Sequence, residues 1–163
     1  EPHLYADVSL NANPDVSLLA EIGVAGAEFY DKVFNREPKV AFLSYSTAGS
    51  AEGELVQKVR DAAALAKNNN DYIIEGEMQF DSAFVPCVAK KKCPSSKIQG
   101  KANVFVFPDL NCGNIAYKIA ERLGHCQAVG PIMLNFKYPV NDLSRGCSVK
   151  DIYDTVVITA LQV

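Results

Sequence analysis

The residues best suited to chemistry lie near the end of the sequence, in the polar stretch 139–151. Arg145 stands between Ser144 and Gly146, just ahead of a predicted helix start. A guanidinium offers a forked pair of donors to an oxyanion, and the hydroxyl and backbone N–H groups beside it add to them. The arrangement predicts a phosphate-binding turn whose candidate residues are Asn141, Ser144, Arg145 and Gly146. The alternative is a structural turn in which the polar side chains satisfy backbone groups, and the pattern alone favours that alternative.

Asp151 ends the same stretch and has two interpretations. It stands three positions after Ser148, which is the spacing of a capping box, where the two side chains satisfy the first N–H groups of a helix. A carboxylate in this place can instead take a proton from a thiol, whose pKa is ordinarily ~8.5, if the site excludes water. Spacing alone favours capping over catalysis.

Two further turns suit an anion, because each joins a predicted strand to a predicted helix and unpaired N–H groups gather there. The first spans residues 44–50 and is rich in hydroxyls, and the second spans residues 107–114. The candidate cleft-lining residues are Ser46, Thr47, Asp109, Asn111 and Cys147. Each also fits a local role, because serine and threonine cap helices, aspartate and asparagine form turns, and cysteines are commonly buried and inert.

Strands and helices that alternate along the chain must position these turns. Continuous apolar runs predict strands at residues 40–45, 72–74, 103–107 and 128–133. Apolar residues at helical spacing predict helices at about 13–34, 55–66, 81–91, 114–123 and 152–161. The alternation predicts an α/β fold with a mainly parallel sheet and helices on both faces. Gly23 and Gly26 favour close helix packing, and Tyr45 and Phe80 are expected in the core.

The composition is that of a globular domain, with 48% hydrophobic residues, 21% charged residues and a net charge of −3. The scattered charges form no basic face for nucleic acid, and no apolar run approaches the ~20 residues of a membrane span. Five cysteines without a C-x-x-C pair and two histidines argue against a metal site and a disulfide framework. We therefore expect a protein of the reducing cytoplasm. The chain begins without methionine, so we expect a fragment.

Taken together, these turns and several other motifs make the chain resemble the phosphate acetyltransferase (phosphotransacetylase) family. The resemblance covers essentially the whole chain, and its last motif is highly specific. The motifs are Tyr5-Ala6-Asp7 with Asn11, residues 43–50, Asp71 with residues 75–81, residues 100–104, residues 107–111 with Gly113-Asn114, residues 129–131, and residues 139–148.

The resemblance implies reversible transfer of an acetyl group between acetyl phosphate and coenzyme A, without a metal or cofactor. It implies that Ser144 and Arg145 bind and polarise acetyl phosphate, and that Asp151 is the base toward the thiol of coenzyme A. It also implies a homodimer of two-domain subunits, similar in fold to isocitrate and isopropylmalate dehydrogenases, with the site between the domains.

By this comparison residues 1–130 form most of the second domain. Residues 131–163 would be a return segment that completes a first domain absent from this chain, so the chain alone should be inactive or weakly active. Two alternatives share the fold: a phosphate butyryltransferase, and a non-catalytic domain that senses acyl-coenzyme A. The run 141–146 favours acetyl transfer. The joint presence of Ser144, Arg145 and Asp151 favours catalysis over sensing.

Overall fold

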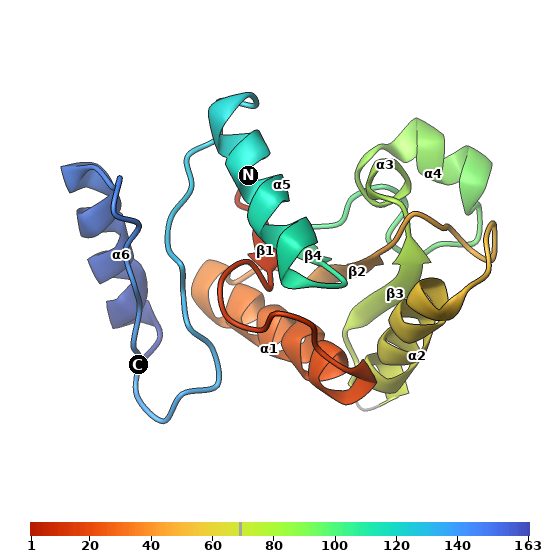
Figure 1. Cartoon of the computed structure of the whole chain (residues 1–163), viewed down its shortest axis with the longest axis horizontal. Coiled ribbons are helices and arrows are strands. Elements are labelled where there is room, and N and C mark those ends of the chain that lie inside the picture. Colours follow the sequence, from red (N-terminus) through yellow and green to blue (C-terminus); the bar gives the residue numbers. More distant parts are fainter. Residues whose placement is uncertain (69) are drawn as a thin grey trace.

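Four parallel strands form the centre of the computed structural model, which describes residues 1–68 and 70–163 (Figure 1). They are β1 (Leu4–Ala6), β2 (Lys39–Leu43), β3 (Ile73–Met78) and β4 (Val104–Val106), in the order β1-β4-β2-β3. Each neighbouring pair is parallel. The residues of β4 are at most 1% exposed, as in a parallel strand that is covered on both faces. The predicted α/β class and parallel sheet are confirmed.

Helices α1 (Val16–Phe34) and α2 (Glu54–Asn68) cover one face of the sheet. Tyr30 from α1 and Phe42 from β2 are fully buried between them. Gly23 allows α1 to approach the sheet closely, because a Cβ there would lie 2.3 Å from Cζ of Phe42. The expectation that this glycine serves helix packing is confirmed.

Helices α3 (Phe80–Phe84), α4 (Pro86–Lys92) and α5 (Leu110–Arg122) contribute to the core on the other face of the sheet, around Phe105. The predicted arrangement with helices on both faces is therefore confirmed. The single helix expected over residues 81–91 is wrong, because Pro86 disfavours a helical backbone at the residue before it. Val85 accordingly has φ −116° and ψ 110°, and it separates α3 from α4.

Aspartates set the starts of two helices. Asp15 is the N-cap of α1 and accepts a hydrogen bond from Leu18 N at 2.8 Å, so this helix starts two residues after the expected Pro14. Asp109 is the N-cap of α5 and accepts from Cys112 N at 3.0 Å, so α5 starts at residue 110 rather than at 114. Both differences follow from the preference of aspartate for the N-cap position.

The chain after α5 leaves the sheet and returns through an extended segment to α6 (Val149–Leu161), which stands apart from the other helices in Figure 1. The strand predicted at residues 128–133 is wrong, since this segment forms only an isolated antiparallel bridge between Ile132 and Asn141. Pro131 has no N–H for a ladder. The apolar residues of the segment line a cavity instead.

Two aromatic side chains lie outside the core against expectation. Tyr45 is 57% exposed and Phe80 is 44% exposed. Tyr45 stands two positions after the last residue of β2. Phe80 begins the short helix α3, and its ring centroid lies 5.4 Å from that of Phe84. Across the residues that the structure describes, the helices are too short or too polar to cross a membrane.

Candidate functional site

A cavity of about 990 Å³ separates the sheet and its helices from the returning segment. One side of the cavity is formed by β1 with its following loop, by α1 and by α5. The other side is formed by residues 126–135 and by the turn before α6. Ser144, Gly146, Cys147 and Asp151 all line this cavity. The structure thus places four of the predicted site residues on the wall of one cavity.

The turn at residues 144–147 owes its shape to hydrogen bonds around Ser144. The N–H of Cys147 donates to the carbonyl oxygen of Ser144 at 3.0 Å, and the N–H of Gly146 lies 3.4 Å from its hydroxyl oxygen. Arg145, at the tip of this turn, is exposed and is not among the residues that line the cavity. Ser144 therefore borders the cavity, and the exposed guanidinium of Arg145 belongs to the same turn.

Asp151 forms a capping box with Ser148. Oδ2 of Asp151 accepts hydrogen bonds from the N–H of Ser148 at 2.7 Å and from its hydroxyl at 2.8 Å, while the N–H of Asp151 donates to that hydroxyl at 3.2 Å. The N–H bond from Ser148 is the main reason why the pKa of Asp151 is below its usual value. The capping interpretation is confirmed. The same carboxylate borders the cavity, so both roles are open to it.

Asn141 is used inside the returning segment. Its Oδ1 accepts from the N–H of Met133 at 2.9 Å, and its Nδ2 donates to Thr159 Oγ1 at 2.7 Å and to Gln162 Oε1 at 2.6 Å. These bonds connect the segment to the last turns of α6. Asn141 therefore anchors the helix that carries Asp151, and it does not border the cavity.

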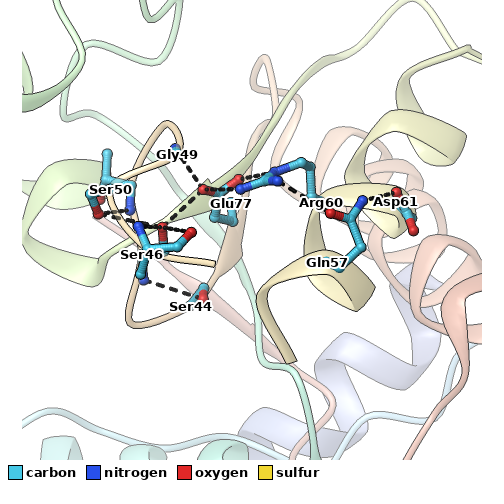
Figure 2. A network of polar contacts seen from close by, with 10 residues as sticks. Ser44, Ser46, Gly49, Ser50, Gln57, Arg60, Asp61 and Glu77 are labelled. Atoms are coloured by element: carbon cyan, nitrogen blue, oxygen red, sulfur yellow. Dashed lines mark hydrogen bonds and ion pairs between the residues drawn. The ribbon is translucent and has the colours of Figure 1, made fainter. Parts of the chain in front are cut away.

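Ser46 and Thr47 are buried after the end of β2, and Figure 2 shows Ser46 within a polar network there. The hydroxyl of Ser46 donates to Oε1 of Glu77 at 3.0 Å, and the same oxygen accepts from the N–H of Gly49 at 2.8 Å. Arg60 completes the network with an ion pair of 3.0 Å to Oε2 of Glu77. The network attaches the loop after β2 to β3 and α2.

Burial raises the pKa of Glu77, but hydrogen bonds from Arg60, Gly49 and Ser46 outweigh it and lower this pKa to about 2. Thr47 is also hydrogen-bonded, because its Oγ1 accepts from the N–H of Gln79 at 2.8 Å. Neither Ser46 nor Thr47 borders the cavity of residues 144–151.

Asp109 and Asn111 lie at the start of α5, where the carboxylate of Asp109 caps the helix. These two residues do not line the cavity either. The loop that follows β1 does line it, from Asp7 to Asn11, and reasoning from residue type gave this loop no part in a site. The available signal was an aspartate directly after a run of apolar residues, at the carboxyl end of what proves to be a strand.

Possible metal ligands lie apart from one another in the described part of the chain. Among residues 1–68 and 70–163, no three histidine, cysteine or acidic side chains come together as a metal site. The five cysteines are free thiols, of which Cys147 is half-buried at the cavity.

Comparison with known proteins gives consistent matches over the whole chain. The family described as phosphate acetyl/butaryl transferase matches residues 1–160. A phosphate acetyltransferase of Bacillus subtilis (strain 168) is 52% identical, over 99% of this chain and 50% of its own length.

Two solved structures have the same fold. An EutD phosphotransacetylase from Staphylococcus aureus superposes with a TM-score of 0.91 at 50% identity, over 98% of this chain and 50% of that chain. A phosphotransacetylase from Streptococcus pyogenes superposes with a TM-score of 0.93 at 51% identity, over 98% of this chain and 49% of that chain. The chain therefore spans about half the length of the relatives that it matches.

Proposed function

Because this chain belongs to the phosphate acetyl/butaryl transferase family, we propose that the protein containing it moves an acetyl group reversibly between acetyl phosphate and coenzyme A. The observation that carries the proposal is the cavity that Ser144, Gly146 and Asp151 share. Ser144 and Asp151 supply a hydroxyl and a carboxylate on one surface, and the exposed guanidinium of Arg145 belongs to the same turn as Ser144. Such a set can hold a phosphoryl group and remove a proton beside it.

In the proposed mechanism Asp151 accepts the proton of the coenzyme A thiol. The thiolate then attacks the carbonyl carbon of acetyl phosphate, and the bond from that carbon to the phosphate oxygen breaks. The ordinary pKa values of a carboxyl and a thiol differ by about 4 to 5 units, so the base must act where water is excluded. Closure of the cavity around the substrates would supply this condition.

Ser144 and Arg145 act on the other reactant. The Ser144 hydroxyl donates to the oxyanion that develops on the acetyl carbonyl, and the Arg145 guanidinium neutralises the departing phosphate. Within the described part of the chain Arg145 has no carboxylate partner, so its charge is available to an anion. The reaction requires neither a metal nor a resident cofactor.

The proposal extends to the architecture of a longer protein, since the relatives are about twice as long as this chain. We propose that residues 1–130 are most of one domain and that residues 131–163 complete another, with the site between them. The exposed apolar side chains of α6 support this, for example Tyr153 at 69% and Val156 at 62% exposure. We further propose a cytoplasmic homodimer.

Acetyl is the acyl group that we propose. The 52% identical relative is named phosphate acetyltransferase, and residues 141–146 carry the motif on which the resemblance to that family depends. A butyryltransferase would transfer the longer acyl group at least as fast. A sensing domain would bind acyl-coenzyme A without turnover.

A spectrophotometric assay of thioester formation from acetyl phosphate and coenzyme A tests the proposal in the full-length protein. We expect turnover with acetyl phosphate, a lower kcat/KM with butyryl phosphate, and little or no turnover by residues 1–163 alone. A full-length protein that binds coenzyme A but forms no thioester from either acyl phosphate would contradict it.

A further inference from the structure

The loop after β1 is organised by the side chain of its first residue. Oδ1 of Asp7 accepts from the N–H groups of Ser9 and Leu10 at 2.7 and 3.0 Å. Oδ2 accepts from the N–H and the side-chain amide of Asn11 at 2.7 and 2.8 Å. Burial raises the pKa of Asp7, but these hydrogen bonds outweigh it and bring the pKa below its usual value. The loop is thus folded around a charged carboxylate.

Helix α5 fixes the same loop from outside. Nδ2 of Asn114 donates to the carbonyl oxygen of Val8 at 3.0 Å. Gly113 lies so close that a Cβ would be 2.0 Å from the carbonyl oxygen of Asp7. The loop is therefore held on two sides and keeps one shape, which suits a surface that positions a ligand.

This loop faces the predicted catalytic turn across one cavity, which both segments line. The N–H groups of residues 9–11 are already bonded to Asp7, and the Asp7 charge repels anions, so the loop is unsuited to a phosphate. It offers the side chains of Val8 and Leu10 instead, and Leu10 is 56% exposed. A surface of this kind fits a neutral and partly apolar chain.

We propose that residues 7–11 form the wall against which the neutral, thiol-bearing arm of coenzyme A lies when its sulfur reaches Asp151. Asp7 is the positioning residue of this wall, and Val8 and Leu10 are its contact surface. The inference rests on the proposed function, and it adds a place for one of the two substrates.

The test compares Michaelis constants for the two substrates in the full-length protein. Asp7→Ala should raise KM for coenzyme A by about tenfold or more and change KM for acetyl phosphate by less than about twofold, since only the thiol side of the site is displaced. Asp7→Asn keeps one carbonyl acceptor and should restore part of the loss. Asp15→Ala is the matched control. Asp15 also accepts a hydrogen bond from a backbone N–H, that of Leu18 at 2.8 Å, but it lies outside the cavity. It should lower the melting temperature and leave both constants unchanged.

Leu10→Ser decides the question if Asp7→Ala does not fold, because an exposed leucine contributes little to folding. It should raise KM for coenzyme A, whereas Leu55→Ser, at a 67% exposed leucine of α2, should not. An unchanged KM for coenzyme A in Leu10→Ser, or an equal rise in KM for acetyl phosphate, contradicts the proposal that residues 7–11 form this wall. Either result leaves the proposed function intact. A folded wild-type protein without any acetyl transfer overturns both.

Discussion

Glu77 carries a charge into the interior, with only 4% of its surface exposed. An unpaired charge there would cost several kcal/mol, and the ion pair to Arg60 with the donors of the β2 loop offsets this cost. Since the pKa in the folded protein is about 2 against an ordinary 4.5, the carboxylate stabilises the fold at neutral pH. That contribution is complete above pH 4.5 and is lost as the pH falls toward 2.

We predict that Glu77→Gln lowers the free energy of unfolding at pH 7 by about 3 kcal/mol, the value that the pKa difference implies. Urea unfolding at pH 7 and at pH 3 measures it. Wild type should lose stability between these two pH values more steeply than the variant. Equal losses in both proteins would show that Glu77 is not the group responsible.

Arg145 has no partner among the described side chains, so its removal should not disturb the fold. We predict that Arg145→Ala in the full-length protein raises KM for acetyl phosphate by at least ~10-fold, because a charge-assisted hydrogen bond to phosphate contributes about 1.5–3 kcal/mol. Lys137→Ala removes a cation elsewhere on the returning segment and is the control. Equal KM values for acetyl phosphate in Arg145→Ala and wild type would show that the guanidinium does not bind this substrate.

Elements decide which predictions from sequence hold. Buried strands such as β2 and β4 were predictable because their continuous apolar runs have helices to cover them. Residues 128–133 carry a similar apolar run, but these residues face a cavity rather than covering helices. Local sequence does not tell these two surroundings apart. The predicted starts of α1 and α5 were wrong for a different reason, since the N-caps of these helices are Asp15 and Asp109.

Helix α5 depends on the contact between Gly113 and the loop after β1. We predict that Gly113→Ala destabilises the chain by about 2 kcal/mol or more, although alanine favours helices, because the added methyl group would overlap the carbonyl of Asp7. Thermal unfolding monitored by circular dichroism measures this. Gly146→Ala is the control, since a Cβ there has open space. A stabilised Gly113→Ala variant would contradict the packing.

The whole molecule consists of a sheet covered by helices and a returning segment that ends in α6. The sequence motif at residues 139–151 predicted the turn at Ser144 and the cap at Asp151, since local spacing defines both. The opposite wall at residues 7–11 was not predictable, because more than 120 residues separate it from that motif and only the fold brings them to one cavity. Ser46, Thr47 and Asp109 bond to neighbouring groups of the chain, and neither these residues nor Asn111 line the cavity.

The isolated chain exposes the apolar side of α6, for example Val156 and Tyr153. We predict that residues 1–163 associate with themselves in solution, because an uncovered apolar face of this kind is normally an interface. Sedimentation velocity at rising concentration measures the association, and Val156→Lys with Tyr153→Lys should reduce it. A monomer at all concentrations would contradict the role of α6 as a docking helix.

The most direct test of the central claim is the turnover number of the full-length Asp151→Asn variant beside that of Ser148→Ala. Both substitutions remove hydrogen bonds of the same capping box, so both should cost a similar stability of about 1 kcal/mol. If the carboxylate is the base, only Asp151→Asn loses turnover, by at least ~100-fold. If both folded variants turn over acetyl phosphate at the wild-type rate, Asp151 is a helix cap and the proposed mechanism is wrong.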